Sequence, residues 1–137
     1  MNDRSPAEGG TIGEILLRPH IYYGPTVSAA RAAGEVRGMA HVTGGGIPGN
    51  LVRVLPAGVR ADVQIGSWPV PEFFRFLQES GKVPRAEAFE IWNMGIGLIL
   101  VVAGRDADAV ERAIQGSGAA CHRIGEIAAG EREVMLR

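Results

Sequence analysis

Hydrophobic and polar residues follow two different spacings along this chain, so the pattern predicts both strands and helices. The block at residues 93–103 is almost continuously apolar, which predicts a strand at the centre of a sheet with both faces covered. Residues 59–65 alternate between apolar and polar side chains, as in a strand with one buried face. Residues 106–115 repeat apolar side chains at helical spacing, which predicts an amphipathic helix.

Capping residues, prolines and glycines bound the other predicted elements. Thr11 and Glu14 have the spacing of a capping box, which predicts a short helix over residues 11–17. Since strands and helices do not alternate in a strict β-α-β order, the predicted class is α+β, with a mixed sheet and helices on at least one face. We also expect helices over residues 22–33, 50–55, 71–81 and 84–92, and strands over residues 39–42, 120–128 and 133–136.

The composition indicates one globular domain. The 137 residues are enough for one hydrophobic core, and 46% of them are hydrophobic. The formal net charge of −1 gives no basic excess to attract nucleic acid, so no nucleic-acid partner is expected. The longest apolar run, residues 96–103, is shorter than the ~20 residues of a membrane helix, so no membrane partner is expected either.

The compartment is predicted from what the chain lacks. Its single cysteine, Cys121, cannot form an intramolecular disulfide, and no apolar signal core follows the first residues. We therefore expect a cytoplasmic protein with a flexible polar segment at residues 1–10 and a folded domain at residues 11–137.

The segment that most favours a binding role is the glycine-rich stretch after His41. Thr43 precedes three consecutive glycines, Asn50 follows them, and no acidic residue occurs from Val42 through Arg60. Backbone N–H groups in such a loop can bind an anion without repulsion from a neighbouring carboxylate. A tight turn is the alternative explanation, because glycine serves both purposes.

The histidines and a second pair of glycines leave other chemistry open. His41 is as consistent with a hydrogen-bonded core histidine as with a functional one, while His20 and His122 stand alone and are expected to be structural or exposed. No second His or Cys lies near His41 at metal-ligand spacing, so no metal site is expected. The glycines in residues 93–97 indicate a bulge, the close approach of another backbone, or a functional loop. No residue stands out as catalytic.

Four segments in this order resemble the C-terminal domain of the phosphoribosylformylglycinamidine cyclo-ligase family, also called aminoimidazole ribonucleotide synthetases. They are His41-Val-Thr-Gly-Gly-Gly46, Asn50 with Arg53-Val-Leu-Pro56, Trp68 before an aromatic helix, and Asn93-Met-Gly-Ile-Gly97. The resemblance extends from about residue 13 to residue 137 and implies a three-layer α/β/α arrangement with a mixed sheet. It also implies the following substrate- or phosphate-binding residues: His41, Thr43, Gly44, Gly45, Gly46, Asn50 and Asn93.

The same resemblance implies an enzyme of purine biosynthesis. In this family ATP activates the formyl oxygen of formylglycinamidine ribonucleotide, and ring closure gives aminoimidazole ribonucleotide, ADP and phosphate. An N-terminal domain, which this sequence does not include, supplies most ligands of ATP and Mg²⁺ and forms the dimer. We therefore expect this chain alone to be inactive and to bind no cofactor. Its expected partners are the substrate, the N-terminal domain and a second copy.

Three positions depart from the family pattern. The family usually has Pro-Thr-Arg-Ile-Tyr where this chain has Pro19-His-Ile-Tyr-Tyr23, so Ile21 replaces an arginine. Gly49 takes the place of a common glutamate, and Glu90 that of an arginine. These changes leave two alternatives open. One is a non-catalytic binding or interaction module, and the other is a different ATP-using relative such as a selenophosphate synthetase or a thiamine monophosphate kinase.

Overall fold

The computed structural model describes residues 4–5 and 9–137 of the chain. The predicted flexible segment at residues 1–10 lies partly outside these residues and stays a prediction; of its described part, Arg4 forms an isolated β-bridge with Thr11. The helices are α1 (Ile12–Leu16), α2 (Gly24–Ala33), α3 (Gly46–Leu51), α4 (Glu72–Ser80), α5 (Arg85–Ile91) and α6 (Ala107–Gly116), with 3₁₀ turns η1 (Val52–Val54) and η2 (Gly104–Asp106). The strands are β1 (Val36–His41), β2 (Val59–Val63), β3 (Leu98–Val102), β4 (Gly125–Ala129) and β5 (Val134–Leu136).

Most helices form where local signals predict them. The capping box is confirmed, because the Glu14 N–H donates to Thr11 Oγ1 at 3.2 Å and the Thr11 N–H donates to Glu14 Oε2 at 2.7 Å. The predictions at residues 71–81, 84–92 and 106–115 are confirmed as α4, α5 and α6. The helix expected at residues 50–55 begins earlier, at Gly46, and ends as η1, because the glycine loop turns directly into α3.

Strand boundaries differ more from the predictions. β1 begins at Val36 rather than at residue 39, and residues 120–124 precede β4 without strand structure. The predicted long strand at residues 93–103 is strand only over β3. Its first part is a turn with positive φ at Met94 and Gly95, a conformation that apolar patterning cannot reveal.

The strands divide between two sheets. β1 and β3 pair antiparallel, with Ala40 opposite Ile99 and His41 opposite Leu98. β2 lies between β4, which is antiparallel to it, and β5, which is parallel to it. The α+β class is confirmed, and the second sheet is mixed as expected. Among the described strands β3 pairs only with β1, so the predicted central position of that strand is wrong.

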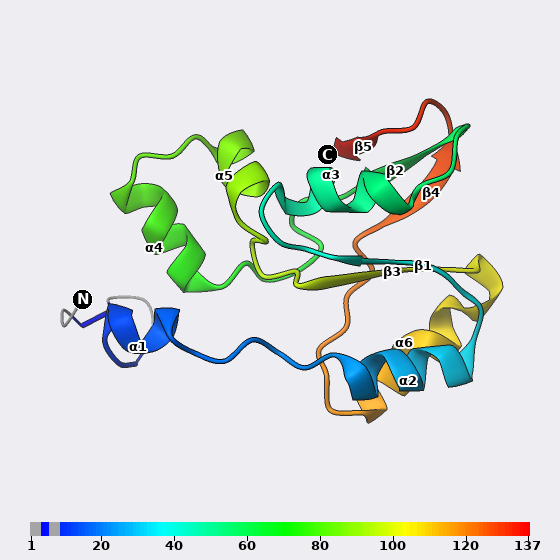
Figure 1. Ribbon diagram of the computed structural model, residues 1–137, viewed down its shortest axis with the longest axis horizontal. Coiled ribbons are helices and arrows are strands. Elements are labelled where there is room, and N and C mark those ends of the chain that lie inside the picture. Colours follow the sequence, from blue (N-terminus) through cyan, green and yellow to red (C-terminus); the bar gives the residue numbers. More distant parts are fainter. Residues whose placement is uncertain (1–3, 6–8) are drawn as a thin grey trace.

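Helices cover both faces of the β1–β3 sheet, as the three-layer expectation requires. Figure 1 shows α3 on one side of this sheet and the paired helices α2 and α6 on the other. The side chains of Ile99 and Val101 pack in the core that α3 completes, whereas Leu100 and Val102 pack against buried residues of α2 and α6. β3 is therefore covered on both faces, which confirms that part of the prediction.

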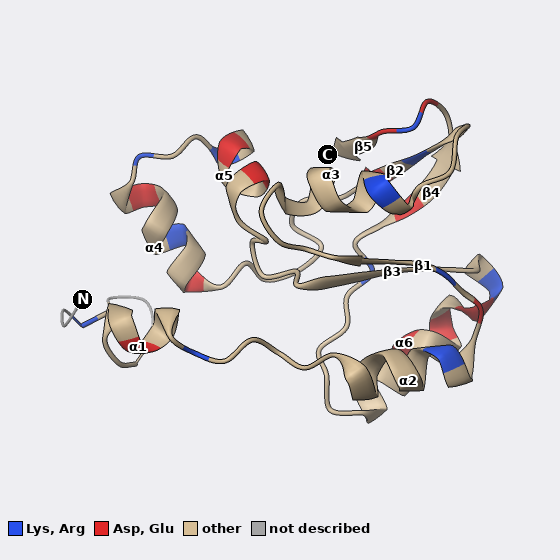
Figure 2. Cartoon of the chain, viewed as in Figure 1, with Lys and Arg blue, Asp and Glu red and all other residues tan. Residues whose placement is uncertain are grey.

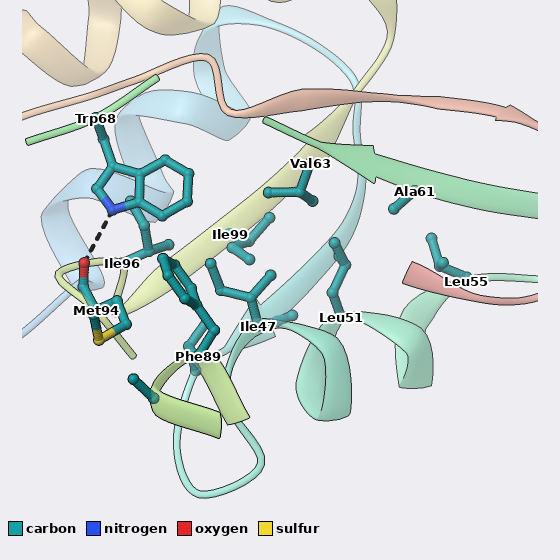
Figure 3. Close-up of a cluster of buried hydrophobic side chains, with 13 residues drawn as sticks. Ile47, Leu51, Leu55, Ala61, Val63, Trp68, Phe89, Met94, Ile96 and Ile99 are labelled. Carbon is teal, nitrogen blue, oxygen red and sulfur yellow. Dashed lines mark hydrogen bonds between the residues drawn. The ribbon is translucent and has the colours of Figure 1, made fainter. Parts of the chain in front are cut away.

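The main core joins the two sheets and positions the loops. Figure 3 shows Ile47 and Leu51 of α3 beside Ile99 of β3 and Val63 of β2. The Trp68 side chain is 4% exposed, and its indole N–H donates to the Met94 carbonyl at 3.0 Å. Because an aromatic ring that is this deeply buried has one fixed orientation, this bond holds the turn at residues 93–97 against the core.

The segment before α2 stands apart from this core. Figure 1 shows α1 at the end of an extended segment, away from the sheets. The large apolar side chains of Leu17, Ile21 and Tyr22 are 78%, 67% and 83% exposed. Several exposed large apolar side chains in one short segment are consistent with a protein interface.

Candidate functional site

The two glycine-containing segments lie next to each other. The carboxyl end of β1 pairs with the amino end of β3, and the Val42 N–H donates to the Gly97 carbonyl at 2.9 Å. Residues 43–46, which we call the glycine loop, therefore leave the sheet beside the turn at residues 93–97. This shared edge is the candidate site.

Gly46 serves the structure of the loop. Its φ is +58°, and a Cβ at this position would overlap the Phe89 carbonyl oxygen and lie 2.8 Å from the Phe89 carbonyl carbon. Its N–H is also used, since it donates to the Thr43 carbonyl at 3.0 Å. Only glycine allows the loop to approach the backbone of α5 this closely.

Gly44 and Gly45 have a different environment from Gly46. Both are exposed, and no atom lies within 4 Å of the position that a Cβ of Gly44 would take. Neither N–H has a hydrogen-bond partner among the described residues. Figure 2 shows that the glycine loop carries no acidic residue where it enters α3. The loop thus presents two unused donors to solvent without a carboxylate of its own.

The buried side chain of Asn50 holds the glycine loop through hydrogen bonds to its carbonyls. It is 6% exposed, and its Nδ2 donates to the carbonyls of Thr43 at 3.3 Å, Gly44 at 3.3 Å and Gly46 at 2.7 Å. The Thr43 hydroxyl is 3.4 Å from Asn50 Oδ1. Because these bonds occupy both hydrogens of the amide, Asn50 fixes the shape of the loop.

A hydrogen bond within the turn at residues 93–97 stabilises its shape. Asn93 Oδ1 accepts a hydrogen bond from the Gly95 N–H at 3.0 Å. A Cβ on Gly95 would lie 2.6 Å from Pro71 Cδ, and a Cβ on Gly97 would overlap the Tyr23 hydroxyl. Both glycines therefore mark close approaches of other segments, which was one of the predicted explanations.

His41 belongs to a cluster of three exposed or partly exposed rings. Its ring centre is 5.0 Å from that of His20 and 6.2 Å from that of Tyr23. His41 is exposed, so the core-histidine alternative is wrong. The expectation that His20 stands alone is also wrong, because residues far apart in sequence meet only in the fold. Burial raises the pKa of the Tyr23 phenol above its usual value.

Within residues 4–5 and 9–137, no three His, Cys, Asp or Glu side chains are grouped so that they could hold a metal ion. No helix there has the length and apolar character needed to cross a bilayer. Burial raises the pKa of the Cys121 thiol, so this group is a poor nucleophile at neutral pH.

The fold is that of an α+β domain in which a glycine loop and a glycine-containing turn meet at one sheet edge. The profile of the family described as "AIR synthase related protein, C-terminal domain" matches residues 2–136, and this chain belongs to that family.

Similar proteins include several phosphoribosylformylglycinamidine cyclo-ligases. The phosphoribosylformylglycinamidine cyclo-ligase of Bacillus velezensis is 45% identical over 121 residues, which cover 88% of this chain and 35% of the relative. The protein of the same name from Bacillus subtilis is 42% identical over 120 residues, again 88% of this chain and 35% of the relative. This chain thus spans about a third of the length of these relatives.

A solved structure supports the fold. The crystal structure of Escherichia coli HypE superposes with a TM-score of 0.65 over 91% of this chain and 40% of that chain. The two sequences are 19% identical, so the likeness concerns the fold alone.

Proposed function

We propose that this chain is the C-terminal domain of an ATP-dependent phosphoribosylformylglycinamidine cyclo-ligase, which closes formylglycinamidine ribonucleotide into aminoimidazole ribonucleotide in purine biosynthesis. The identity to relatives of that name supports the proposal, and so does the arrangement of the two loops. The protein would act in the cytoplasm. ATP and Mg²⁺ would be held mainly by the N-terminal part of the enzyme, as the resemblance to the family implies.

The observation that carries the proposal is the pair of unused N–H groups at Gly44 and Gly45. Hydrogen bonds from backbone N–H groups to a phosphate oxygen are charge-assisted and stronger than those between neutral groups. The loop is already held in shape by Asn50, so binding would not have to order it. We therefore assign the glycine loop to a phosphate or another anionic group of the substrate.

The predicted site residues divide by role under this proposal. Gly44 and Gly45 would donate to the anion, with the exposed residues His41 and Thr43 just before them in the chain; the Thr43 hydroxyl already donates to Asn50. Gly46 and Asn50 would keep the loop in its binding shape. Asn93 would hold the neighbouring turn. No residue of this chain is assigned the chemical step.

The exposed apolar segment before α2 supports an N-terminal partner domain. The relatives are about three times as long as the aligned region. Leu16, Leu17, Ile21 and Tyr22 would be covered by that domain, and a second copy of the enzyme would complete a homodimer.

The test is ATP-dependent formation of aminoimidazole ribonucleotide. The chain alone should give no product, and adding the N-terminal part of a full-length relative should restore turnover. Substrate binding to the chain alone, measured by calorimetry, should weaken when Gly44→Glu places a carboxylate in the loop. Turnover by the chain alone would overturn the division of roles, and unchanged binding in G44E would overturn the assignment of the loop.

One observation favours the second candidate, a binding or interaction module without catalysis. Ile21 is 67% exposed at a position where the family usually has an arginine. An arginine there could reach a phosphate, whereas isoleucine cannot. Restoring it with Ile21→Arg distinguishes the two functions: a large gain in turnover of the reconstituted enzyme would indicate that this chain has lost catalytic competence.

A further inference from the structure

A second surface of the domain has the dimensions of a ligand site. A hollow of about 660 Å³ lies between the loop at residues 65–70, α4 and α5, and we call it the α4–α5 hollow. Small-molecule sites have volumes of roughly 300–1,000 Å³. Gly44 and Gly45 do not line this hollow, and of the candidate site described above it shares only Met94 of the turn at residues 93–97.

The floor of the α4–α5 hollow is apolar and firmly held. It includes Trp68, Phe89 and Met94, which are 4%, 2% and 2% exposed. The rings of Trp68 and Phe89 meet edge to face with 6.2 Å between their centres. Figure 3 shows the indole N–H of Trp68 directed at the Met94 carbonyl, which fixes the floor on its other side. Ile65 and Val70 of the same lining are only half-buried, and over this rigid floor they offer apolar surface to the flat or aliphatic part of a ligand.

The rim of the same hollow is polar and carries more positive than negative charge. Arg75 of α4 and Arg85, the first residue of α5, both line it and are exposed. Neither guanidinium group has an ion-pair or hydrogen-bond partner in the described structure. The lining also holds the amide of Gln78 and one carboxylate, that of Glu79. Because both guanidinium groups line the same hollow, a phosphate or carboxylate bound in it can form charge-assisted hydrogen bonds with them.

We propose that the α4–α5 hollow binds a small organic anion, with its phosphate or carboxylate between Arg75 and Arg85 and its apolar part against the floor. This site is independent of the proposed function. It lies behind the glycine loop, because Phe89 contributes its ring to the floor and its carbonyl to the contact with Gly46. A bound anion would therefore contact residues that also support the loop.

The experiment uses phenyl phosphate as the probe. The chain is titrated with phenyl phosphate, inorganic phosphate and phenol, and affinity is measured by calorimetry and by two-dimensional amide spectra. The variants are Arg75→Gln, Arg85→Gln, the double variant, and Arg31→Gln on α2 as a matched control on the other side of the β1–β3 sheet. All three arginines are exposed, so thermal unfolding should show that every variant folds like the parent.

The proposal predicts one-to-one binding of phenyl phosphate that shifts the Trp68 indole and Arg85 amide signals. Each single variant should weaken it about fivefold and the double variant more than about tenfold, while R31Q leaves it unchanged. Equal affinity in the double variant and the parent would overturn the proposal, as would the absence of binding. Equal affinity for inorganic phosphate would overturn the role given to the apolar floor.

Discussion

Gly46 gives the sharpest test of how the glycine loop is built. Replacing it with alanine adds one methyl group at a position where φ is +58° and where that group would overlap the Phe89 carbonyl oxygen. The same methyl would lie 3.2 Å from Glu90 Cα, so two successive residues of α5 block it. Since the obstacle is backbone, it cannot move away as a flexible side chain would.

The expected cost is the sum of two effects. A non-glycine residue in the left-handed region costs about 1 kcal/mol. The loop and α5 must also separate, and overpacking in a well-packed region typically costs about 1–3 kcal/mol. The affected region is tightly packed, since Ile47 and Phe89 beside it are 0% and 2% exposed. We therefore expect G46A to lower the free energy of unfolding by about 3 kcal/mol and the Tm by roughly 10 °C.

Urea and thermal unfolding, followed by circular dichroism, measure this cost. Gly44→Ala is the matched control, because no atom lies within 4 Å of the added methyl and the backbone there has no positive φ. G44A should stay within about 0.5 kcal/mol of the parent. A G46A protein as stable as the parent would refute the argument that close approach to α5 requires glycine.

Three further outcomes follow from the structure. Asn50→Asp should lower stability by about 3 kcal/mol in urea unfolding, because a buried carboxylate would face three carbonyls without a donor. Thr11→Ala should raise amide exchange in α1 about fivefold, as expected for the loss of about 1 kcal/mol of capping, and should leave global unfolding unchanged. The hydrogen bonds from Arg137 and Arg60 lower the pKa of the Asp62 carboxyl group, so the ionised group stabilises the fold at neutral pH. This stabilisation should decrease as the pH falls below about 4. In Asp62→Asn, the urea concentration at the midpoint of unfolding should therefore fall less steeply at acid pH than in the parent.

Local patterns were sufficient where the structure depends on near neighbours. Thr11 and Glu14 predicted the start of α1, and the helical spacing of residues 106–115 predicted α6. In both cases the interacting residues are three or four positions apart, so the sequence contains the whole signal. The absence of acids from Val42 through Arg60 likewise predicted a loop that has no carboxylate in its own sequence and can offer N–H donors to an anion; that role stays a prediction.

Contacts between distant segments could not be predicted in this way. The division into two sheets depends on which strands pair, and β3 finds its partner more than fifty residues earlier in the chain. Gly46 must be glycine because the Phe89 carbonyl, more than forty residues later in the chain, occupies the space of a Cβ. His41 contacts His20 only because the fold brings the segment before α2 to the end of β1. Asn50 was assigned to ligand binding, and nothing in its spacing showed that the carbonyls of the loop already engage its amide.

The most direct test of the central claim is a titration of the chain with formylglycinamidine ribonucleotide, followed through the backbone amide signals of Gly44 and Gly45. The claim predicts that these two signals shift together and saturate with one affinity, while the Gly46 signal, whose N–H is bonded to the Thr43 carbonyl, moves less. Saturable binding that does not shift the amide signals of Gly44 and Gly45 would contradict the claim.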